Sequence, residues 1–233
     1  MPARRAPDLP GIVRGEAREL RELAGRQWRR MLLLFAGVLL PLWGFLDLAA
    51  RVQGDGLLPF DVPVLRFAEG LSGAGPDRLF LFFSALGYGY GVVPFDIALV
   101  AGLALAKRFR ESVFAAVALG GSALLNIAAK HLVARQRPAL WQSIAPEPTW
   151  SFPSGHAMGS MTLAVVLVLL AWPTRLRWWV FAAMAVFVPM VGFSRVYLGV
   201  HYPSDILAGW TAACAWGVGA YLVAMRGRIP RTG

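Results

Sequence analysis

Long apolar stretches dominate this chain, and several approach the length that a helix needs to cross a lipid bilayer. Of the 233 residues, 57% are hydrophobic and only 15% are charged, whereas about a quarter of the residues in a typical soluble domain are charged. A helix of about 20 apolar residues spans the hydrocarbon core. We therefore expect an all-α chain that spends most of its length in lipid. A disordered protein, a coiled coil and a soluble globular domain are excluded.

Six stretches are candidate transmembrane helices, and the second of them is interrupted. It runs from Leu79 to Ala106, which is longer than a bilayer requires, and it contains Pro94 and three closely spaced glycines. We expect an interfacial helix up to about Leu86 and a bent span from about Val92. The other candidates are Met31–Ala50, Val113–Ala129, Ala157–Trp172, Trp178–Phe193 and Ile206–Met225. The sequence thus predicts one six-transmembrane-helix bundle over residues 31–226, followed by a short cytoplasmic tail over 227–233.

The first 30 residues differ from the rest because they are polar and rich in arginine. They carry eight Arg and four acidic residues, and apolar residues recur at helical spacing from Val13 to Ala24. Two interpretations of Gly11 to Arg30 stay open: a basic amphipathic helix on the membrane surface, and a solvated helical tail. The first apolar stretch begins only at Met31 and has no adjoining cleavage site, so we expect no cleavable signal peptide.

Basic residues are distributed unequally between the two sides of the predicted bundle. Sixteen Lys and Arg fall on the side of the N-terminus and seven on the other side. Because cytoplasmic loops are enriched in Lys and Arg, both termini are expected in the cytoplasm. The same distribution explains the net charge of +10, and nucleic-acid binding is not expected. The single cysteine, Cys214, excludes an internal disulfide framework and a multi-cysteine metal site.

Three polar stretches lie at span ends on the outer side and carry residues suited to binding phosphate. They are Lys130 to Arg137-Pro138, Pro153-Ser154-Gly155-His156, and Ser194-Arg195 to His201 and Asp205. Lys130 and Arg137 are seven residues apart and could share one helix face until Pro138 ends the helix. With Arg195 they could clamp a dianion, since guanidinium groups match phosphate oxygens in pairs.

The second and third stretches add a helix N-terminus and a histidine–carboxylate pair. Ser154 and Gly155 are expected to open a helix whose free N–H groups and dipole attract anions, and His156 lies in its first turn. His201 and Asp205 are four residues apart. The carboxylate can accept from one imidazole nitrogen and leave the other free as a nucleophile.

Several other polar residues are given structural or peripheral roles. His131 and Arg135 are interpreted as solvated interfacial side chains, and Asp47 and Asp96 as structural residues within spans. Contacts to a substrate headgroup are expected from the outer loop, at Trp141, Gln142, Glu147 and Trp150.

In order and spacing, the three motifs resemble the complete signature of the type 2 phosphatidic acid phosphatase superfamily. They lie within Lys130–Asp205, about a third of the chain. The resemblance implies that His201 attacks phosphorus to form a phosphohistidine, that Asp205 orients it, and that His156 protonates the leaving oxygen and later helps to activate water. It also implies phosphate contacts from Lys130, Arg137, Ser154, Gly155 and Arg195. It implies no cofactor and no metal, and the sequence has no cluster of acids near these motifs that would hold Mg²⁺.

The function implied is that of an integral-membrane lipid phosphatase at the outer face of a bacterial inner membrane. Undecaprenyl diphosphate is the first expected substrate, followed by phosphatidic acid, phosphatidylglycerol phosphate and a lipid A phosphate. Vanadate-dependent haloperoxidases belong to the same superfamily, but they are soluble. A lipid phosphotransferase that uses the same site and a non-enzymatic anion transporter or channel remain as alternatives. The oligomeric state stays open.

Overall fold

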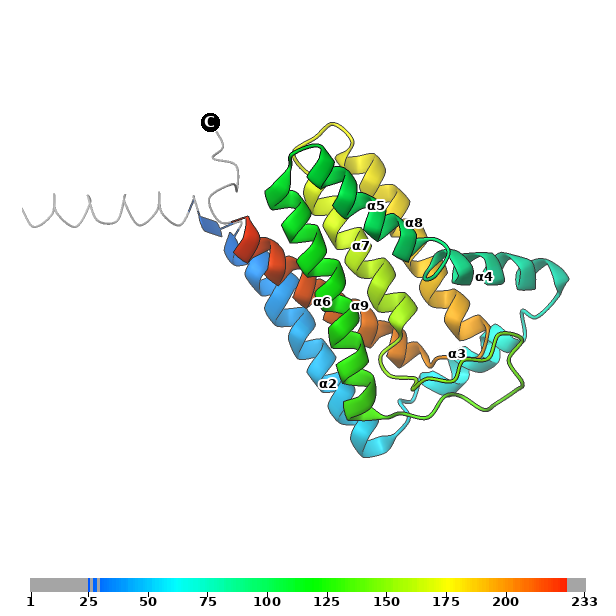
Figure 1. Ribbon diagram of the computed structural model, residues 1–233. Coiled ribbons are helices and arrows are strands. Elements are labelled where there is room, and N and C mark those ends of the chain that lie inside the picture. Colours follow the sequence, from blue (N-terminus) through cyan, green and yellow to red (C-terminus); the bar gives the residue numbers. More distant parts are fainter. Residues whose placement is uncertain (1–24, 26, 29, 226–233) are drawn as a thin grey trace, which may run out of the picture.

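The computed structural model describes residues 25, 27, 28 and 30–225, and every regular element in these ranges is helical. In chain order the elements are the π-helical turn η1 (Phe35–Leu39), α2 (Leu40–Asp55), α3 (Asp61–Glu69), α4 (Ala74–Leu86), α5 (Val92–Leu105), α6 (Phe109–Val133), α7 (Gly155–Ala171), α8 (Arg177–Tyr197) and α9 (Pro203–Ala224) (Figure 1). The all-α prediction is therefore confirmed for the described residues. The predicted amphipathic helix before Arg30 and the tail over 227–233 lie outside them, apart from a few residues next to Arg30.

Among the described residues, four helices are long and apolar enough to cross a bilayer, judged by length and composition. They are the continuous helix Arg30–Asp55, which includes η1 and α2, and the helices α6, α8 and α9. Helices α5 and α7 are also apolar, but they have only 14 and 17 residues. Each of the six predicted spans thus coincides with a helix, while four of these helices reach the length of a full span.

The second apolar stretch is divided where its glycines predict. Helix α4 ends at Leu86 and α5 begins at Val92, with a turn over residues 87–91 between them. A Cβ atom on Gly91 would lie 2.2 Å from the carbonyl oxygen of Leu86, so this turn requires glycine. In Figure 1, α4 projects sideways from the bundle whereas α5 runs along it.

Helix α3 was not predicted from the sequence. Its nine residues are too few for a clear hydrophobic period. Leu65 and Ala68 are fully buried, and α3 packs against α8 and α9. Asp61 lies in its first turn, where a carboxylate complements the helix dipole. The helix therefore carries a buried acid to the end of the bundle at which α9 begins.

Helix α9 is the centre of the bundle and packs against α2, α6 and α7. Small residues allow such close packing: a Cβ atom on Gly209 would lie 2.9 Å from the carbonyl oxygen of Ser154. This approach holds the beginning of α9 beside the beginning of α7. As a result, the C-terminal ends of α6 and α8 and the N-terminal ends of α7 and α9 meet at one end of the bundle (Figure 1).

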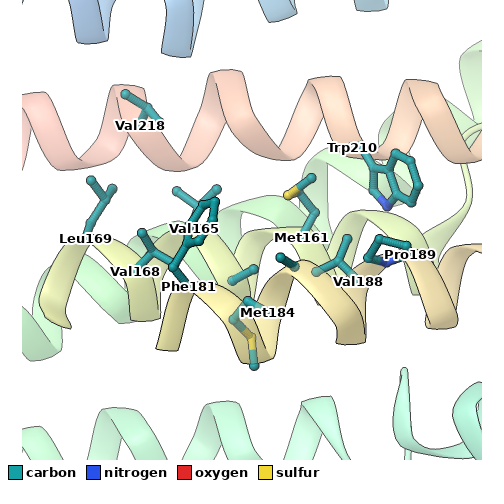
Figure 2. A pocket seen from close by; sticks show the side chains of 12 residues that line it. Met161, Val165, Val168, Leu169, Phe181, Met184, Val188, Pro189, Trp210 and Val218 are labelled. Atoms are coloured by element: carbon teal, nitrogen blue, oxygen red, sulfur yellow. The ribbon is translucent and has the colours of Figure 1, made fainter. Parts of the chain in front are cut away.

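Away from that end the buried clusters are apolar, although a few polar side chains are buried there too, such as Ser122 and Thr162, whose hydroxyl groups share a hydrogen bond of 2.7 Å. One buried cluster joins α5, α6 and α7 around Val92, Phe114 and Leu163. A groove of about 390 Å³ opens among α7, α8 and α9, and Met161, Phe181 and other apolar side chains line it (Figure 2). None of its lining residues is ionisable. The groove therefore offers no ionisable side chain for catalysis.

Candidate active site

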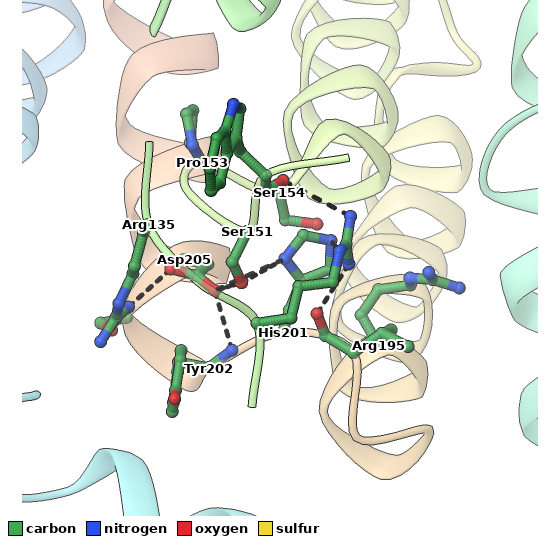
Figure 3. A network of polar contacts seen from close by, with 12 residues as sticks. Arg135, Ser151, Pro153, Ser154, Arg195, His201, Tyr202 and Asp205 are labelled. Atoms are coloured by element: carbon green, nitrogen blue, oxygen red, sulfur yellow. Dashed lines mark hydrogen bonds and ion pairs between the residues drawn. The ribbon is translucent and has the colours of Figure 1, made fainter. Parts of the chain in front are cut away.

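The histidine–carboxylate pair lies where α9 begins (Figure 3). Asp205 is fully buried in the first turn, and its Oδ2 accepts a hydrogen bond of 2.9 Å from the backbone N–H of Tyr202, as a helix-capping carboxylate does. The same oxygen lies 3.4 Å from Nδ1 of His201. Ser151 Oγ donates to Asp205 at 2.5 Å and lies 3.3 Å from Nδ1 of His201. Asp205 therefore caps α9 and also lies against Nδ1 of His201.

The hydrogen bonds assign the tautomer of His201. Its Nε2 lies 3.2 Å from Nη1 of Arg137, and a guanidinium group has donors only. Nε2 must then accept, which leaves the proton on Nδ1, facing Asp205. Burial, followed by the positive charges of Arg137, Arg195 and Lys130, lowers the pKa of His201 well below its usual value. The imidazole is therefore neutral at neutral pH, and Nε2 has the lone pair that a nucleophile needs.

Lys130 and Arg137 both reach the site, but not from one helix face as predicted. Helix α6 ends at Val133, and Ala134 adopts a left-handed conformation with φ of 48°. The chain leaves the helix before Arg137, so the prediction that Pro138 ends it is wrong. The loop over 134–154 places Arg137 instead.

The loop also anchors both cations through its carbonyl groups. Lys130 Nζ donates to the carbonyl oxygen of Trp150. The guanidinium of Arg137 donates to the carbonyl oxygens of Thr149 at 2.6 Å and Val200 at 2.7 Å. These bonds hold both cations beside His201.

Arg195, at the end of α8, forms the other side of this group of cations. Its side chain is 2% exposed. One Nη donates to Ser84 Oγ of α4, and the other donates to Glu147. Its Nε is buried and has no hydrogen-bond partner among the described residues. Glu147 also accepts from Arg137 at 2.8 Å, so one carboxylate bridges both arginines.

The N-terminus of α7 borders the same space. Ser154 is its N-cap: the hydroxyl accepts from the N–H of Ala157, and the N–H of Ser154 donates to the carbonyl oxygen of Asp205 at 3.1 Å. The N–H of Ser154 is thus engaged, whereas those of Gly155 and His156 have no partner within the helix. The imidazole of His156 packs on the Tyr88 ring, with a centroid distance of 5.1 Å.

Arg135 is not the solvated side chain that the sequence suggested. It is 8% exposed, and it donates to Asp205 Oδ1 at 2.6 Å and to Asp61 Oδ2 at 2.8 Å. Further bonds go to Ser204 Oγ at 2.8 Å and to the carbonyl oxygen of Gly56 at 2.7 Å. Its guanidinium therefore lies between two fully buried carboxylates, one of them the partner of His201.

The structure also places three other polar residues to which the sequence analysis gave structural or peripheral roles. His131 is exposed and lies outside the contacts described above. Asp47 forms an exposed pair with Arg51 at 2.8 Å, in keeping with a structural role. Asp96 in α5 has one buried oxygen without a partner among the described residues.

Sequence reasoning missed three features of the site. Ser151 and Asp61 received no role, and Glu147 was expected at a headgroup rather than between the arginines. Ser151 had a detectable signal, because it lies only two residues before the stretch from Pro153 to His156. No group of three or more His, Cys, Asp or Glu able to hold a metal occurs within the part of the chain that the structure describes.

Comparisons with known proteins identify the family of this chain. The profile of the PAP2 superfamily matches residues 111–228. The undecaprenyl-diphosphatase of Sulfolobus acidocaldarius is 30% identical over 166 residues, which are 68% of this chain and 76% of that protein. Phosphatidylglycerophosphatase B of Bacillus subtilis is 26% identical over 172 residues, 72% of this chain and 84% of that protein.

The fold is shared with a solved structure. A transmembrane PAP2-type phosphatidylglycerolphosphate phosphatase from Bacillus subtilis superimposes with a TM-score of 0.70 at 24% identity, covering 84% of this chain and 98% of the other. The family match spans the cations at the end of α6, the start of α7 and the His201–Asp205 pair at the start of α9. The chain belongs to the PAP2 superfamily.

Proposed function

We propose that this chain is an integral-membrane lipid phosphatase that hydrolyses a phosphomonoester or diphosphate of a membrane lipid through a phosphohistidine on His201. One observation carries the proposal. His201 is buried, its Nδ1 faces Asp205, and its Nε2 faces a guanidinium group. An acceptor nitrogen among fixed cations is suited to attack an electrophilic phosphorus, because the cations stabilise the charge on the phosphoryl oxygens.

The reaction proceeds in two transfers. In the first, Nε2 of His201 forms a bond to phosphorus as the bond to the leaving lipid oxygen breaks, and His156 gives that oxygen a proton. Asp205 holds the Nδ1 proton and balances the positive imidazole. In the second, water attacks phosphorus while His156 takes its proton, and the bond between phosphorus and nitrogen breaks. Lys130, Arg137, Arg195 and the N-terminus of α7, capped by Ser154 and opened by Gly155, hold the phosphoryl oxygens during both transfers.

His156 must carry a proton in the first transfer although cations surround it. An arriving phosphoryl dianion offsets the charge of these cations. Binding of the substrate therefore favours the imidazolium form. The ring stays in position because it packs on Tyr88.

The site lies at the ends of the bundle helices, at the depth of a lipid headgroup. We propose six spans, with both termini in the cytoplasm and the site at the outer face of a bacterial inner membrane. Undecaprenyl diphosphate is the first candidate substrate, and phosphatidylglycerol phosphate follows. Relatives named for these two activities support this order. Phosphatidic acid and a lipid A phosphate come next.

The test is phosphate release by the purified protein in detergent from a panel of these lipids, with and without EDTA. We expect turnover that EDTA does not abolish and that vanadate inhibits. Loss of turnover in chelator, restored by Mg²⁺, would refute the metal-free mechanism. Transfer of the labelled phosphoryl group to an added alcohol instead of water would identify a phosphotransferase. Anion flux in liposomes without any hydrolysis would favour the transporter alternative.

A further inference from the structure

Glu147 contacts the groups that the proposed reaction assigns to the phosphoryl oxygens. Its Oε2 accepts from Nη2 of Arg137 at 2.8 Å, and its Oε1 accepts from Nη2 of Arg195. Oε1 also lies 3.8 Å from Nδ1 of His156. A single carboxylate thus faces two binding cations and the proposed proton donor.

A carboxylate and a phosphoryl group make the same kind of contact with guanidinium, because each presents a pair of anionic oxygens. While Glu147 accepts hydrogen bonds from these two Nη groups, they are not fully available to donate to a phosphoryl group. Nε of Arg195 is buried without a partner among the described residues. Arg195 therefore has a donor that Glu147 does not satisfy.

The loop around Glu147 keeps its carboxylate close to the site. Glu147 lies between Pro146 and Pro148, and proline restricts its own φ and the conformation of the residue before it. The loop is also held at Trp141, whose ring packs against the segment between α8 and α9. A Cβ atom on Gly199 in that segment would lie 2.6 Å from the ring. A tethered group of this kind has a high effective concentration at the arginines.

The carboxylate is nevertheless able to leave. The Glu147 side chain is 26% exposed, whereas the side chains of Asp61 and Asp205 are fully buried. Rotation of the side chain toward solvent returns its charge to water, so the loop itself does not need to open. Glu147 is the displaceable anion of the site.

We propose that Glu147 is a tethered competitor for the phosphoryl site, which every phosphate ligand must displace and which returns to help expel the phosphate product. The proposal rests on the proposed function, because it concerns the same site. The displacement is identical for every dianion, so it weakens the binding of substrate, orthophosphate and vanadate by one common factor. A lipid substrate tolerates this loss because the bilayer concentrates it at the site.

The experiment compares wild type with Glu147→Gln, which keeps the size of the side chain and removes its charge. We expect the inhibition constants of orthophosphate and orthovanadate and the KM of a soluble aryl phosphate to fall together by about tenfold or more. Tenfold corresponds to 1.4 kcal/mol. Glu147→Asp, which keeps the charge but is too short to bridge both arginines, should give a smaller fall. Glu69→Gln is the matched control, because Glu69 forms an exposed pair with Arg66 at 2.7 Å.

Two outcomes would overturn the proposal. Unchanged or weaker binding of all three anions in Glu147→Gln would mean that Glu147 only positions the arginines. A fall for one anion and not for the others would mean a direct contact rather than a common competitor. Calorimetric titration of orthophosphate into detergent-solubilised protein measures binding without turnover. Absent lipid hydrolysis would count against the proposed function, whereas unchanged orthophosphate binding in the calorimetric titration would count against this inference. Thermal unfolding of each variant, with and without orthophosphate, identifies a folding defect.

Discussion

Arg135→Lys tests whether the buried network behind Asp205 positions the nucleophile. The guanidinium makes four hydrogen bonds of 2.6–2.8 Å, and its side chain is 6% exposed. An ammonium group keeps the charge, but it donates from a single point and cannot reach both sides of the network. About two bonds are lost, and bonds to charged groups contribute about 1.5–3 kcal/mol each. The free energy of unfolding should therefore fall by roughly 3–6 kcal/mol.

The kinetic consequence should be confined to the chemical step. Arg135 contacts Asp205 and not the proposed phosphoryl cradle, so kcat should fall by about 10²-fold, as expected for a misplaced catalytic group, with KM within about twofold. Steady-state kinetics and thermal unfolding in detergent measure these effects. Arg66→Lys is the control, since its exposed pair with Glu69 is worth at most about 1 kcal/mol. A raised KM with unchanged kcat would show that Arg135 binds phosphate and would refute the reasoning.

Four further predictions concern the histidines and the topology. His201→Ala should abolish turnover and acid-labile label on the protein after a pulse of labelled substrate, whereas label that persists would place the nucleophile elsewhere. His156→Ala should lose about 10²–10⁴-fold on a lipid monophosphate and less on an aryl phosphate, whose leaving group needs little protonation; an equal loss on both would argue against a general acid. Because burial and nearby cations lower the pKa of His201, its imidazole should stay neutral at pH 6. The unfolded chain then binds more protons than the folded one below about pH 6.5, and stability should decrease as the pH falls through this range. Side-chain ¹⁵N NMR of the three histidines checks this, and titration of His201 near 6.5 would contradict it. Reporters fused at Gly233 and within the loop 141–150 should read opposite sides of the membrane, and a cytoplasmic loop signal would invert the proposed orientation.

The helices could be predicted because span length and apolar composition depend on local sequence alone. The break between Leu86 and Val92 was predicted correctly for the same reason, since its glycines are adjacent in the chain. Helix α3 was missed because its stability comes from contacts with α8 and α9 rather than from a long apolar period. The predicted end of α6 at Pro138 was wrong because Ala134 adopts a left-handed conformation that ends the helix, and no glycine in the sequence indicates it.

The sequence indicated which residue types bind phosphate, but not which way they face. Arg135 and Arg137 are two residues apart, and once the helix ends at Val133 their side chains go to different partners. Arg137 reaches His201, whereas Arg135 joins Asp205 to Asp61, which is 74 residues away in the chain. The spacing of residues in the sequence cannot reveal a partner that is so far away in the chain. The sequence placed Glu147 near the substrate headgroup. Its contact with both arginines depends on the path of the whole loop and could not be predicted.

The two carboxylate–arginine groups around His201 differ in how easily the negative partner can leave. Asp205 is fully buried and shares Arg135 with another buried acid. Removing Arg135 would leave two buried carboxylates without a compensating charge, which costs several kcal/mol, so this group is fixed and suits the orientation of His201. Glu147 is partly exposed and faces Arg137 and Arg195, and water can solvate it when it leaves. The cations that the proposed mechanism assigns to the phosphoryl oxygens are therefore paired with the carboxylate that is more easily exchanged.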